Sequence, residues 1–529
     1  MCRTEVGALA LSFLFLFQFA QAERPNVLVC ISDDQSYPHA SAYGEPVIQT
    51  PGFDQVARQG MLFHNAFTPA PGCSPMRAAF LTGKYIWQIR EAGTHASHFP
   101  KDLETFPYRL QEHGYKIGYT GKPWGPGKFN VSGWKANPAG PAFNSKKNKA
   151  PNGISSTNYA ANFEAFLNEK DADEPFCFWF GGHEPHRKFD KGIGAKAGMD
   201  ASKVKVPGFL PDAPEIRDDL LDYFYEIQWF DSHLVRMLEE LSSRGMLENT
   251  IVIVTSDNGM SFPRAKANVY EYGIHMPLAI SWPKQFPKGR MSQDVVNLID
   301  VTATIYDLCE IELPEAISGK SLRSVLNGNA TAPRTMTFSG RERHSSSRYN
   351  SLGYPQRCIR TESYLYIRNY TPERWPAGTP QKFASVKYDS NNDEVSPKLG
   401  PEHGGYHDID ACPSLNFLIE QRDSSQWGRY LGLSVDKRPR EEFYDIRGDA
   451  DCLNNLVGSA KHAIALERHR KLLTDELTRT GDLRETDFAA SQVWETYPRY
   501  SSLRWFPKPD WAEKNPPPEQ EWLDARRPR

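Results

Sequence analysis

"TIVIVTSDNG", residues 250–259, is the stretch that decides the fold class of this chain. Its β-branched run from Thr250 to Thr255 predicts a strand of the parallel type, because strands covered on both faces are near-continuous runs of such residues. The polar residues Asp257 and Asn258 follow the run directly. In open α/β sheets, ligands bind beyond the carboxyl ends of the strands. The stretch therefore predicts a covered sheet with polar groups at its ligand-binding edge.

Strand and helix signals alternate along the first part of the chain. Further strands are expected at residues 27–31, 116–119, 176–180 and 278–282. Helices are expected at residues 51–60, 74–83, 103–113 and 217–244. Such alternation predicts an α/β fold in which helices cover both faces of a large mixed sheet.

The chain changes character after about residue 345. Strand signals at 360–369 and 442–446 and a helix signal at 461–479 predict a smaller α+β domain with an antiparallel sheet. Residues 371–436 are rich in Pro, Gly and polar residues, and the end of the chain is rich in Pro and Trp. We expect a catalytic domain at 23–345, a C-terminal α+β subdomain at 346–496 and a tail at 497–529 that packs on the body.

Composition limits the classes of partner. The 62 basic and 65 acidic residues leave a formal charge of −3, which gives no global field to attract nucleic acid or an anionic membrane. Residues 1–22 are predicted to be a signal peptide, because a basic residue precedes an apolar run and Ala20-Gln21-Ala22 fits the cleavage rule. A membrane anchor is the weaker alternative, since the apolar run is too short to span a bilayer. We expect export to a periplasmic, extracellular or lysosomal-type compartment, with no membrane span in the mature chain.

The cysteines do not form an obvious disulfide framework. Eight are present, of which Cys2 would leave with the signal peptide, and the rest are scattered without C-x-x-C spacing. Cys30 and Cys177 lie inside apolar strand-like runs and are expected to be core thiols. Cys73 lies outside any such apolar run.

Polar clusters directly follow three of the predicted strands: Asp33-Asp34, His183 to His186, and Asp257-Asn258. A lone acidic pair after a strand is usually only a turn. Three such clusters after three strands favour a functional site instead.

Residues 73–83, CSPMRAAFLTG, carry the chemistry. Ser74 suits a helix N-cap, Pro75 the first helical position and Gly83 the C-terminal stop. Cys73 would then lie at the start of a short helix, where an anion and hence a thiolate are favoured. Arg77, one turn further on, can point the same way, whereas a merely buried cysteine would not need it.

The pattern Cys73-x-Pro75-x-Arg77 followed by Leu81-Thr82-Gly83 resembles the signature of type I sulfatases. Other segments match the motifs of that family in the family's order: Asp33-Asp34, Gly121-Lys122, His183-Glu184-Pro185-His186, Ser256-Asp257-Asn258-Gly259 and Glu442-Phe443-Tyr444-Asp445-Ile446. Within the family, the likeness is closest to the heparan N-sulfatase (sulfamidase) group. It implies an alkaline-phosphatase-like sulfatase fold.

The resemblance also implies the cofactors. A formylglycine-generating enzyme would convert Cys73 to formylglycine, whose hydrate attacks sulfur and whose second hydroxyl allows sulfate to be expelled. The metal would be Ca²⁺, with Mg²⁺ possible, held by Asp33, Asp34, residue 73, Asp257 and Asn258. Oxygen ligands without soft atoms suit these ions rather than zinc.

The remaining roles follow from the same resemblance. Arg77 would hold the formylglycine, Lys122 and Lys266 would bind the sulfate oxygens, and His186 would protonate the leaving group. His183 would bind sulfate or support the site. As isolated residues, both lysines would be expected on the solvated surface.

Substrate contacts are predicted from the region that follows the strand signal at 335–339. The candidates are Arg341, Arg343, His344 and Arg357, and the alternative is a solvated charged loop. Trp375 and Tyr406 are candidates for stacking on sugar rings, with ordinary packing as the alternative.

Two positions depart from the family pattern. Trp124 stands where sulfatases commonly have a histidine, two residues after Lys122, and an indole cannot shuttle protons. His275 stands where many relatives have an arginine.

The sequence thus predicts a sulfohydrolase acting on a sulfated saccharide, either of the N-sulfoglucosamine type or O-sulfated. One alternative is a phosphoester or phosphonate hydrolase of the same superfamily. The other is a non-catalytic saccharide-binding relative in which Cys73 stays unmodified. A homodimer is plausible for the family.

Overall fold

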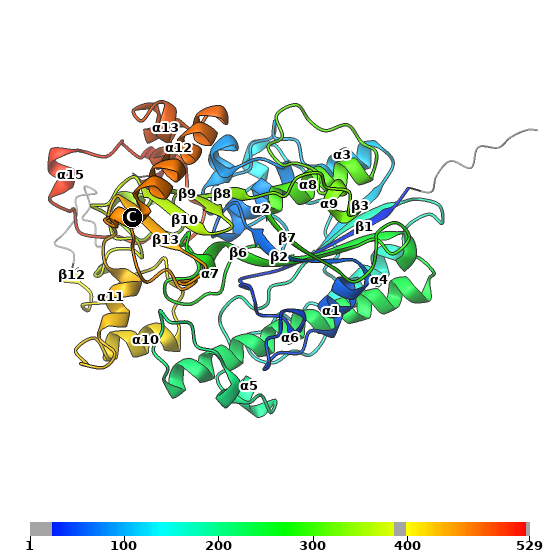
Figure 1. Cartoon of the computed structure of the whole chain (residues 1–529), viewed down its shortest axis with the longest axis horizontal. Helices are drawn as coiled ribbons and strands as arrows, with labels where there is room; N and C mark the ends of the chain where they lie inside the picture. Colours follow the sequence, from blue (N-terminus) through cyan, green and yellow to red (C-terminus); the bar gives the residue numbers. More distant parts are fainter. Residues whose placement is uncertain (1–23, 386–397, 525–529) are drawn as a thin grey trace, which may run out of the picture.

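The computed structural model describes residues 24–385 and 398–524, so the predicted signal peptide lies outside the described residues. A seven-stranded sheet in the order β3-β4-β1-β5-β6-β2-β7 runs through the centre of the molecule (Figure 1). Its strands are β1 (Asn26–Ser32), β2 (Met61–Phe67), β3 (Lys116–Gly121), β4 (Phe176–Gly181), β5 (Thr250–Ser256), β6 (His275–Ser281) and β7 (Arg290–Asn297).

The sheet is mixed, as predicted. Strand β1 pairs in parallel with β4 and β5, whereas β6 runs antiparallel to both β5 and β2. The sequence did not predict β2 and β7. Strand β2 carries the polar pair His64 and Asn65 where its pairing register shifts, and β7 is an edge strand whose first half is largely exposed, so neither has a continuous apolar run.

Helices cover both faces of the sheet. The helices are α1 (Pro51–Gln59), α2 (Cys73–Thr82), α3 (Phe106–Glu112), α4 (Tyr159–Asn168), α5 (Ile193–Lys196), α6 (Pro214–Ser243), α7 (Glu271–Ile274), α8 (Leu298–Leu308), α9 (Arg323–Leu326), α10 (Pro413–Glu420), α11 (Arg429–Val435), α12 (Ala463–Arg479), α13 (Leu483–Thr486), α14 (Val493–Thr496), α15 (Trp511–Lys514) and α16 (Glu521–Asp524).

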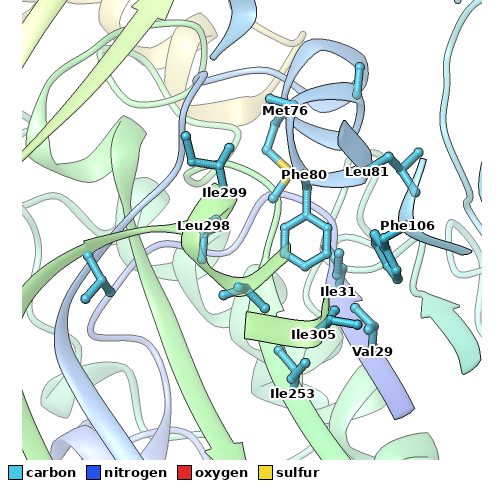
Figure 2. Packing of buried hydrophobic residues seen from close by; sticks show 14 of the residues in the cluster. Val29, Ile31, Met76, Phe80, Leu81, Phe106, Ile253, Leu298, Ile299 and Ile305 are labelled. Atoms are coloured by element: carbon cyan, nitrogen blue, oxygen red, sulfur yellow. The ribbon is translucent and has the colours of Figure 1, made fainter. Parts of the chain in front are cut away.

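Alternate residues of the central strands face opposite layers, because successive side chains of a strand point to opposite faces. Leu28 and Cys30 of β1 pack with α1, α4 and α6 on one face. Val29 and Ile31 pack with α2, α3 and α8 on the other face. Figure 2 shows Phe80 of α2 inserted into this second layer. The predicted core positions of Cys30 and Cys177 are confirmed, since both thiols are fully buried.

The C-terminal part contains a second, antiparallel sheet in the order β13-β10-β9-β8. Its strands are β8 (Met336–Arg341), β9 (Gln356–Thr361), β10 (Tyr364–Asn369) and β13 (Glu441–Asp445). The single strand expected at 360–369 is therefore wrong: Glu362 and Ser363 form a tight connection between β9 and β10. The Pro- and Gly-rich stretch after β10 also folds, into α10, α11 and the short pair β11 (Phe383–Ser385) and β12 (Lys398–Leu399).

The described part of the tail lies against the rest of the molecule. Tyr500 donates its backbone N–H to the carbonyl of Ala96 (2.7 Å), and Phe506 and Leu523 are buried. Arg343 donates to the carbonyl of Tyr497 (2.7 Å). Within residues 24–385 and 398–524, none of the helices has the length and apolarity that crossing a bilayer would require.

Candidate active site

The carboxyl ends of four strands bring the predicted site residues to one edge of the sheet, as expected for an open α/β fold. The residues in question follow β1 (Asp33 and Asp34), β3 (Lys122), β4 (His183 and His186) and β5 (Asp257 and Asn258). Backbone hydrogen bonds tie these ends together, because Asp33 donates to the carbonyl of Glu184 (3.0 Å) and Asp257 to that of Ser32 (3.1 Å).

Three buried carboxylates form the centre of the site. Ligand oxygens of Asp33, Asp34 and Asp257 lie within 4.8 Å of one another. Asp34 has a left-handed backbone conformation (φ 76°), and its N–H donates to Oδ1 of Asp257 (3.1 Å). This turn directs successive carboxylates of one loop to the same point.

Asn258 completes this oxygen cluster. Its Nδ2 donates to Oδ1 of Asp34 (2.7 Å), while its Oδ1 is buried without a hydrogen-bond partner among the described residues. Leaving such an oxygen without a partner is costly unless a ligand engages it. Carboxylate and amide oxygens are ligands of hard cations. Asp33, Asp34, Asp257 and Asn258 therefore fit a hard divalent cation.

Lys122 and Lys266 lie in this cluster rather than on the solvated surface. The ammonium of Lys122 contacts Asp33, and Nζ of Lys266 lies 2.7 Å from Oδ2 of Asp34. Burial alone would raise the pKa of Asp33, but Lys122 and other cations hold it well below its usual range. Burial likewise opposes the charge on Lys266, but Asp34 and Asp410 raise its pKa well above the usual value. Both lysines are thus fixed cations at the site.

Cys73 begins α2, with Gly72 as the N-cap residue. Its side chain is 1% exposed, and its Sγ lies 3.5 Å from Oδ1 of Asp33. The expectation of a favoured thiolate is wrong, because burial and the Asp33 carboxylate raise the pKa of the thiol. Ser74 is not the N-cap either; its Oγ accepts the N–H of Ala96 (3.0 Å).

Arg77 lies one turn after Cys73 and is completely buried. Its Nε donates to Oδ2 of Asp257 (2.8 Å) and its Nη1 to the carbonyl of Lys122 (2.6 Å). It therefore connects α2 to the ends of β5 and β3. Its Nη2 has no partner among the described residues and remains available to a group at position 73 or to a bound anion.

A cavity of 570 Å³ opens over this edge of the sheet. Its wall includes Asp33, Lys122, Pro123, Gly125, Pro126, Gly153, Ser155, His183, Glu184, His186, Arg187 and Glu226. His186 is 35% exposed, and its Nε2 lies 4.0 Å from Oδ2 of Asp34. Its Nδ1 lies 2.7 Å from the carbonyl oxygen of Arg187 and donates to it, which leaves Nε2 facing the site. His183 is exposed at the rim of the cavity.

The two departures from the family pattern are buried packing residues. Trp124 is 2% exposed, packs edge-on against Phe99 and donates its indole N–H to the carbonyl of Ser74 (3.2 Å). It supports the first turn of α2. His275 stacks between Tyr37 and Phe67, with ring centroids 4.0 Å and 4.6 Å away.

The predicted substrate ligands are all buried. Arg341 pairs with Asp408, and Arg357 is 0% exposed between Asp482 and Glu342. The guanidinium of Arg343 binds tail carbonyls, as described above. The structure does not present these three guanidinium groups to the cavity, and their role as substrate ligands stays a prediction.

His344 lies nearer to the site. Its ring packs against that of His95 (4.7 Å), and it borders Gly72 at the start of α2. Burial lowers its pKa to about 3, so the ring is neutral at ordinary pH.

Sequence reasoning missed Asp410. Its Oδ2 lies 3.0 Å from Nζ of Lys266, and its carboxylate groups with Asp34 and His186 within 4.8 Å. The residue precedes α10 in the Pro- and Gly-rich stretch, where no strand end marks it as a site residue. The C-terminal part thus contributes a carboxylate beside the oxygen cluster.

The site combines oxygen ligands for a hard cation, fixed buried cations and a helix that starts at residue 73. Together these features fit the hydrolysis of an oxyanion ester. The sulfatase family profile matches residues 25–311. The profile of the N-sulphoglucosamine sulphohydrolase C-terminal region matches residues 264–399. The chain belongs to the sulfatase family and is a sulfatase.

Individual relatives agree with this assignment. The chain is 30% identical to human N-sulphoglucosamine sulphohydrolase over 396 residues, which are 68% of this chain and 76% of that protein. It is 25% identical over 472 residues to an ulvan-active sulfatase of Formosa agariphila, covering 88% and 82% of the two chains. The solved structure of BT4656 in complex with its substrate D-glucosamine-2-N,6-O-disulfate has a TM-score of 0.60 at 20% identity, covering 88% of this chain and 99% of that one. This last likeness concerns the fold, and it confirms the predicted sulfatase fold.

Proposed function

We propose that this chain hydrolyses the sulfate group of a sulfated amino sugar, with a formylglycine at position 73 and Ca²⁺ (or Mg²⁺) as cofactors. The observation that carries the proposal is the placement of residue 73 beside Asp33, in a cluster of carboxylates to which Arg77, Lys122 and Lys266 are bound. The substrate class is suggested by the relatives named for N-sulphoglucosamine and for a glucosamine disulfate.

The cofactors would supply what the chain lacks. A formylglycine at position 73 would provide a hydroxyl nucleophile, and a cation held by Asp33, Asp34, Asp257 and Asn258 would polarise a sulfate oxygen. The raised pKa of the unmodified thiol is consistent with the need for such a modification, because thiols are nucleophilic as thiolates.

The residues of the chain bind and position the reactants. Lys122 and Lys266 neutralise the sulfate oxygens with ammonium groups that are already fixed, which lowers the cost of reorganisation as charge develops. Arg77 holds residue 73 against the cluster through its free Nη2. Because Nδ1 already carries the proton donated to the carbonyl of Arg187, His186 acts as the imidazolium when it gives the proton on Nε2 to the departing nitrogen or oxygen of the sugar; His183 lies at the rim of the cavity.

The wider context belongs to the same proposal. A predicted signal peptide supports export, and conversion of Cys73 requires a formylglycine-generating enzyme in the host. Assembly as a homodimer is proposed from the family resemblance alone.

Two measurements test the proposal. Mass analysis of the tryptic peptide that contains Cys73, from protein made in its native host, should show the aldehyde in place of the thiol. Sulfate release should then be observed with N-sulfo-D-glucosamine or D-glucosamine 6-sulfate. Unmodified thiol throughout would favour the non-catalytic saccharide-binding alternative, and turnover of a phosphate ester alone would favour the phosphoester hydrolase alternative.

A further inference from the structure

Glu226 is a buried acid in the wall of the candidate substrate cavity. Glu226 lies in the middle of α6 and is only 1% exposed. It lines the cavity together with Lys122, His183 and His186. Both of its carboxyl oxygens are without a hydrogen-bond partner among the described residues. A buried polar group in this condition costs stability. None of the roles assigned above uses Glu226.

The acidic neighbours of Glu226 are already engaged. Glu184 accepts the N–H of Ser155 and the hydroxyl of Tyr159, each at 2.9 Å. Asp222 accepts the backbone N–H groups of Gly192 and Gly194. Because both neighbours are acids, neither can supply the positive charge that would stabilise an ionised Glu226.

Arg187, a cation that acts electrostatically on Glu226, is engaged as well. Arg187 forms a two-pronged ion pair with Asp219 (2.7 and 2.8 Å) and donates to the carbonyl of Ser261 (2.7 Å). Burial, together with the nearby Glu184, therefore raises the pKa of Glu226 to about 9. The group is a neutral carboxylic acid at ordinary pH, with one donor and acceptor capacity.

We propose that Glu226 binds a hydroxyl group of the sugar ring that carries the sulfate. The proposal rests on the sulfatase activity proposed above and assigns the sugar subsite of the same cavity. Lys122 and Asp33 belong both to the cavity wall and to the proposed sulfate-binding cluster, whereas the charged neighbours of Glu226 are Glu184, Arg187 and Asp222, to which no reacting role is assigned above. Gly125, Pro126 and Gly153, which also line the cavity, leave room for a ring.

The chemistry of the ligand follows from the charge state. A neutral carboxyl group both donates and accepts, which matches a sugar hydroxyl. An ionised carboxylate only accepts, so it would lose the hydrogen bond that the neutral acid donates to the sugar hydroxyl. Binding of a sulfated sugar should therefore weaken as the pH rises through the pKa of Glu226. Binding of a sulfate ester that has no sugar ring should not depend on this group.

The test compares two substrates and three variants. N-sulfo-D-glucosamine reports the whole cavity, and 4-nitrocatechol sulfate reports the reaction without sugar hydroxyls. The Glu226→Leu variant should lower kcat/KM for the sugar by about 10- to 100-fold, mainly through KM, and leave the aryl sulfate within about threefold. The Glu226→Gln variant keeps a donor and an acceptor and should retain most sugar activity. The Glu239→Leu variant, at an exposed position of the same helix, is the control.

A pH profile provides the second readout. The KM of the wild-type protein for the sugar should rise above about pH 9, and the Glu226→Gln variant should lack this rise; this comparison remains valid if Glu226→Leu fails to fold. Unchanged sugar kinetics in Glu226→Leu, or equal losses on both substrates, would overturn the inference while leaving the proposed function standing. A wild-type protein that releases sulfate from none of N-sulfo-D-glucosamine, D-glucosamine 6-sulfate and 4-nitrocatechol sulfate would refute the proposed function and this inference with it.

Discussion

Cys73 occupies the position proposed above for the nucleophile, and yet its thiol is poorly suited to that role. It faces Asp33 at 3.5 Å inside a buried cluster, and this burial favours the neutral thiol. The start of α2 contributes a favourable dipole, but the effect of a helix terminus is worth only about 0.3–2 kcal/mol. Desolvation and the adjacent carboxylate outweigh it. The position therefore suits a side chain that is nucleophilic without ionisation in the resting state.

Replacing Cys73 tests this interpretation. The Cys73→Ala variant should fold with a Tm close to that of the wild type, because it removes only the terminal group of one short side chain, and it should lose sulfate release by at least about a thousandfold. The control is Cys30→Ala, a buried thiol on the other side of β1, which should retain activity. Turnover of the Cys73→Ala variant at the wild-type rate would refute the assigned role.

The packing of Trp124 is the second feature to test at the residue scale, because by the family resemblance a histidine is common at this position. The Trp124→His variant should stay folded but lose about 2–4 kcal/mol of unfolding free energy, since a histidine fills less of the space against Phe99. Chemical denaturation followed by circular dichroism measures this loss. Trp124→Phe should cost less, and an unchanged midpoint in both variants would contradict the packing role.

At the scale of elements, apolar runs predicted most strands of the central sheet and missed β2 and β7. Strands β1, β4 and β5 are covered on both faces, so their sequences are continuous apolar runs. Strand β7 lies at the edge and is partly exposed, and its sequence resembles a loop. The connection between β9 and β10 was missed because its residues, Glu362 and Ser363, are neither Gly nor Pro, the usual signals of a turn.

The same reasoning explains which site residues could be predicted. Asp33, Asp257 and Lys122 follow strands, so the fold itself brings them to one edge. Asp410 and Glu226 come from a loop of the C-terminal part and from the middle of a helix. Their positions depend on tertiary packing, for which a single sequence offers no local signal.

Strand β9 carries a testable stability feature. Arg357 is completely buried and bound to Asp482 and Glu342. The Arg357→Met variant should lose about 3–5 kcal/mol of unfolding free energy, because buried carboxylates would be left without their partner. Arg470→Met is the matched control: this arginine of α12 pairs with Glu441 at 2.6 Å but is 34% exposed, and its loss should cost less than about 1 kcal/mol.

The outcome also distinguishes two roles of Arg357. A structural role predicts a lower Tm with an unchanged KM at temperatures where the variant is folded. A raised KM with an unchanged Tm would instead support the substrate-binding role predicted from the sequence.

At the scale of the whole molecule, the proposed metal site would couple metal binding to stability. Asp33, Asp34 and Asp257 come from loops far apart in the sequence, so a cation bound between them would join β1 to β5. A ligand that binds only the folded state stabilises it, by about 2.7 kcal/mol at a hundredfold excess over Kd. Ca²⁺ should therefore raise the Tm of protein pretreated with EGTA. The Asp257→Asn variant should show a smaller rise, and an equal rise in both proteins would contradict this site.

Buried ionisable groups outside the cluster contribute to the response of the whole fold to pH. Glu271 and Glu495 are buried against arginines; burial alone would raise their pKa values, but Arg360 and Arg374 lower each to about 2. A depressed carboxyl pKa contributes stability above the unfolded value and loses it as the pH falls. His39, whose pKa burial lowers to about 3, adds a loss that begins earlier, as the pH falls below about 6.5, because the unfolded ring then binds a proton that the folded ring excludes.

Acid unfolding is therefore expected to be steep. The Tm, measured in the presence of EGTA, should fall sharply as the pH drops from about 4.5 towards 2, because the unfolded chain then binds protons that the folded chain excludes. The Glu495→Gln variant should be less stable at pH 6 but should show a shallower decline below pH 4.5, since one of the depressed carboxyls is gone. The exposed Glu467→Gln variant should follow the wild-type slope. A Tm that stays constant down to pH 3 in the wild-type protein would contradict the ion pairs of Glu271 and Glu495 as the source of acid sensitivity.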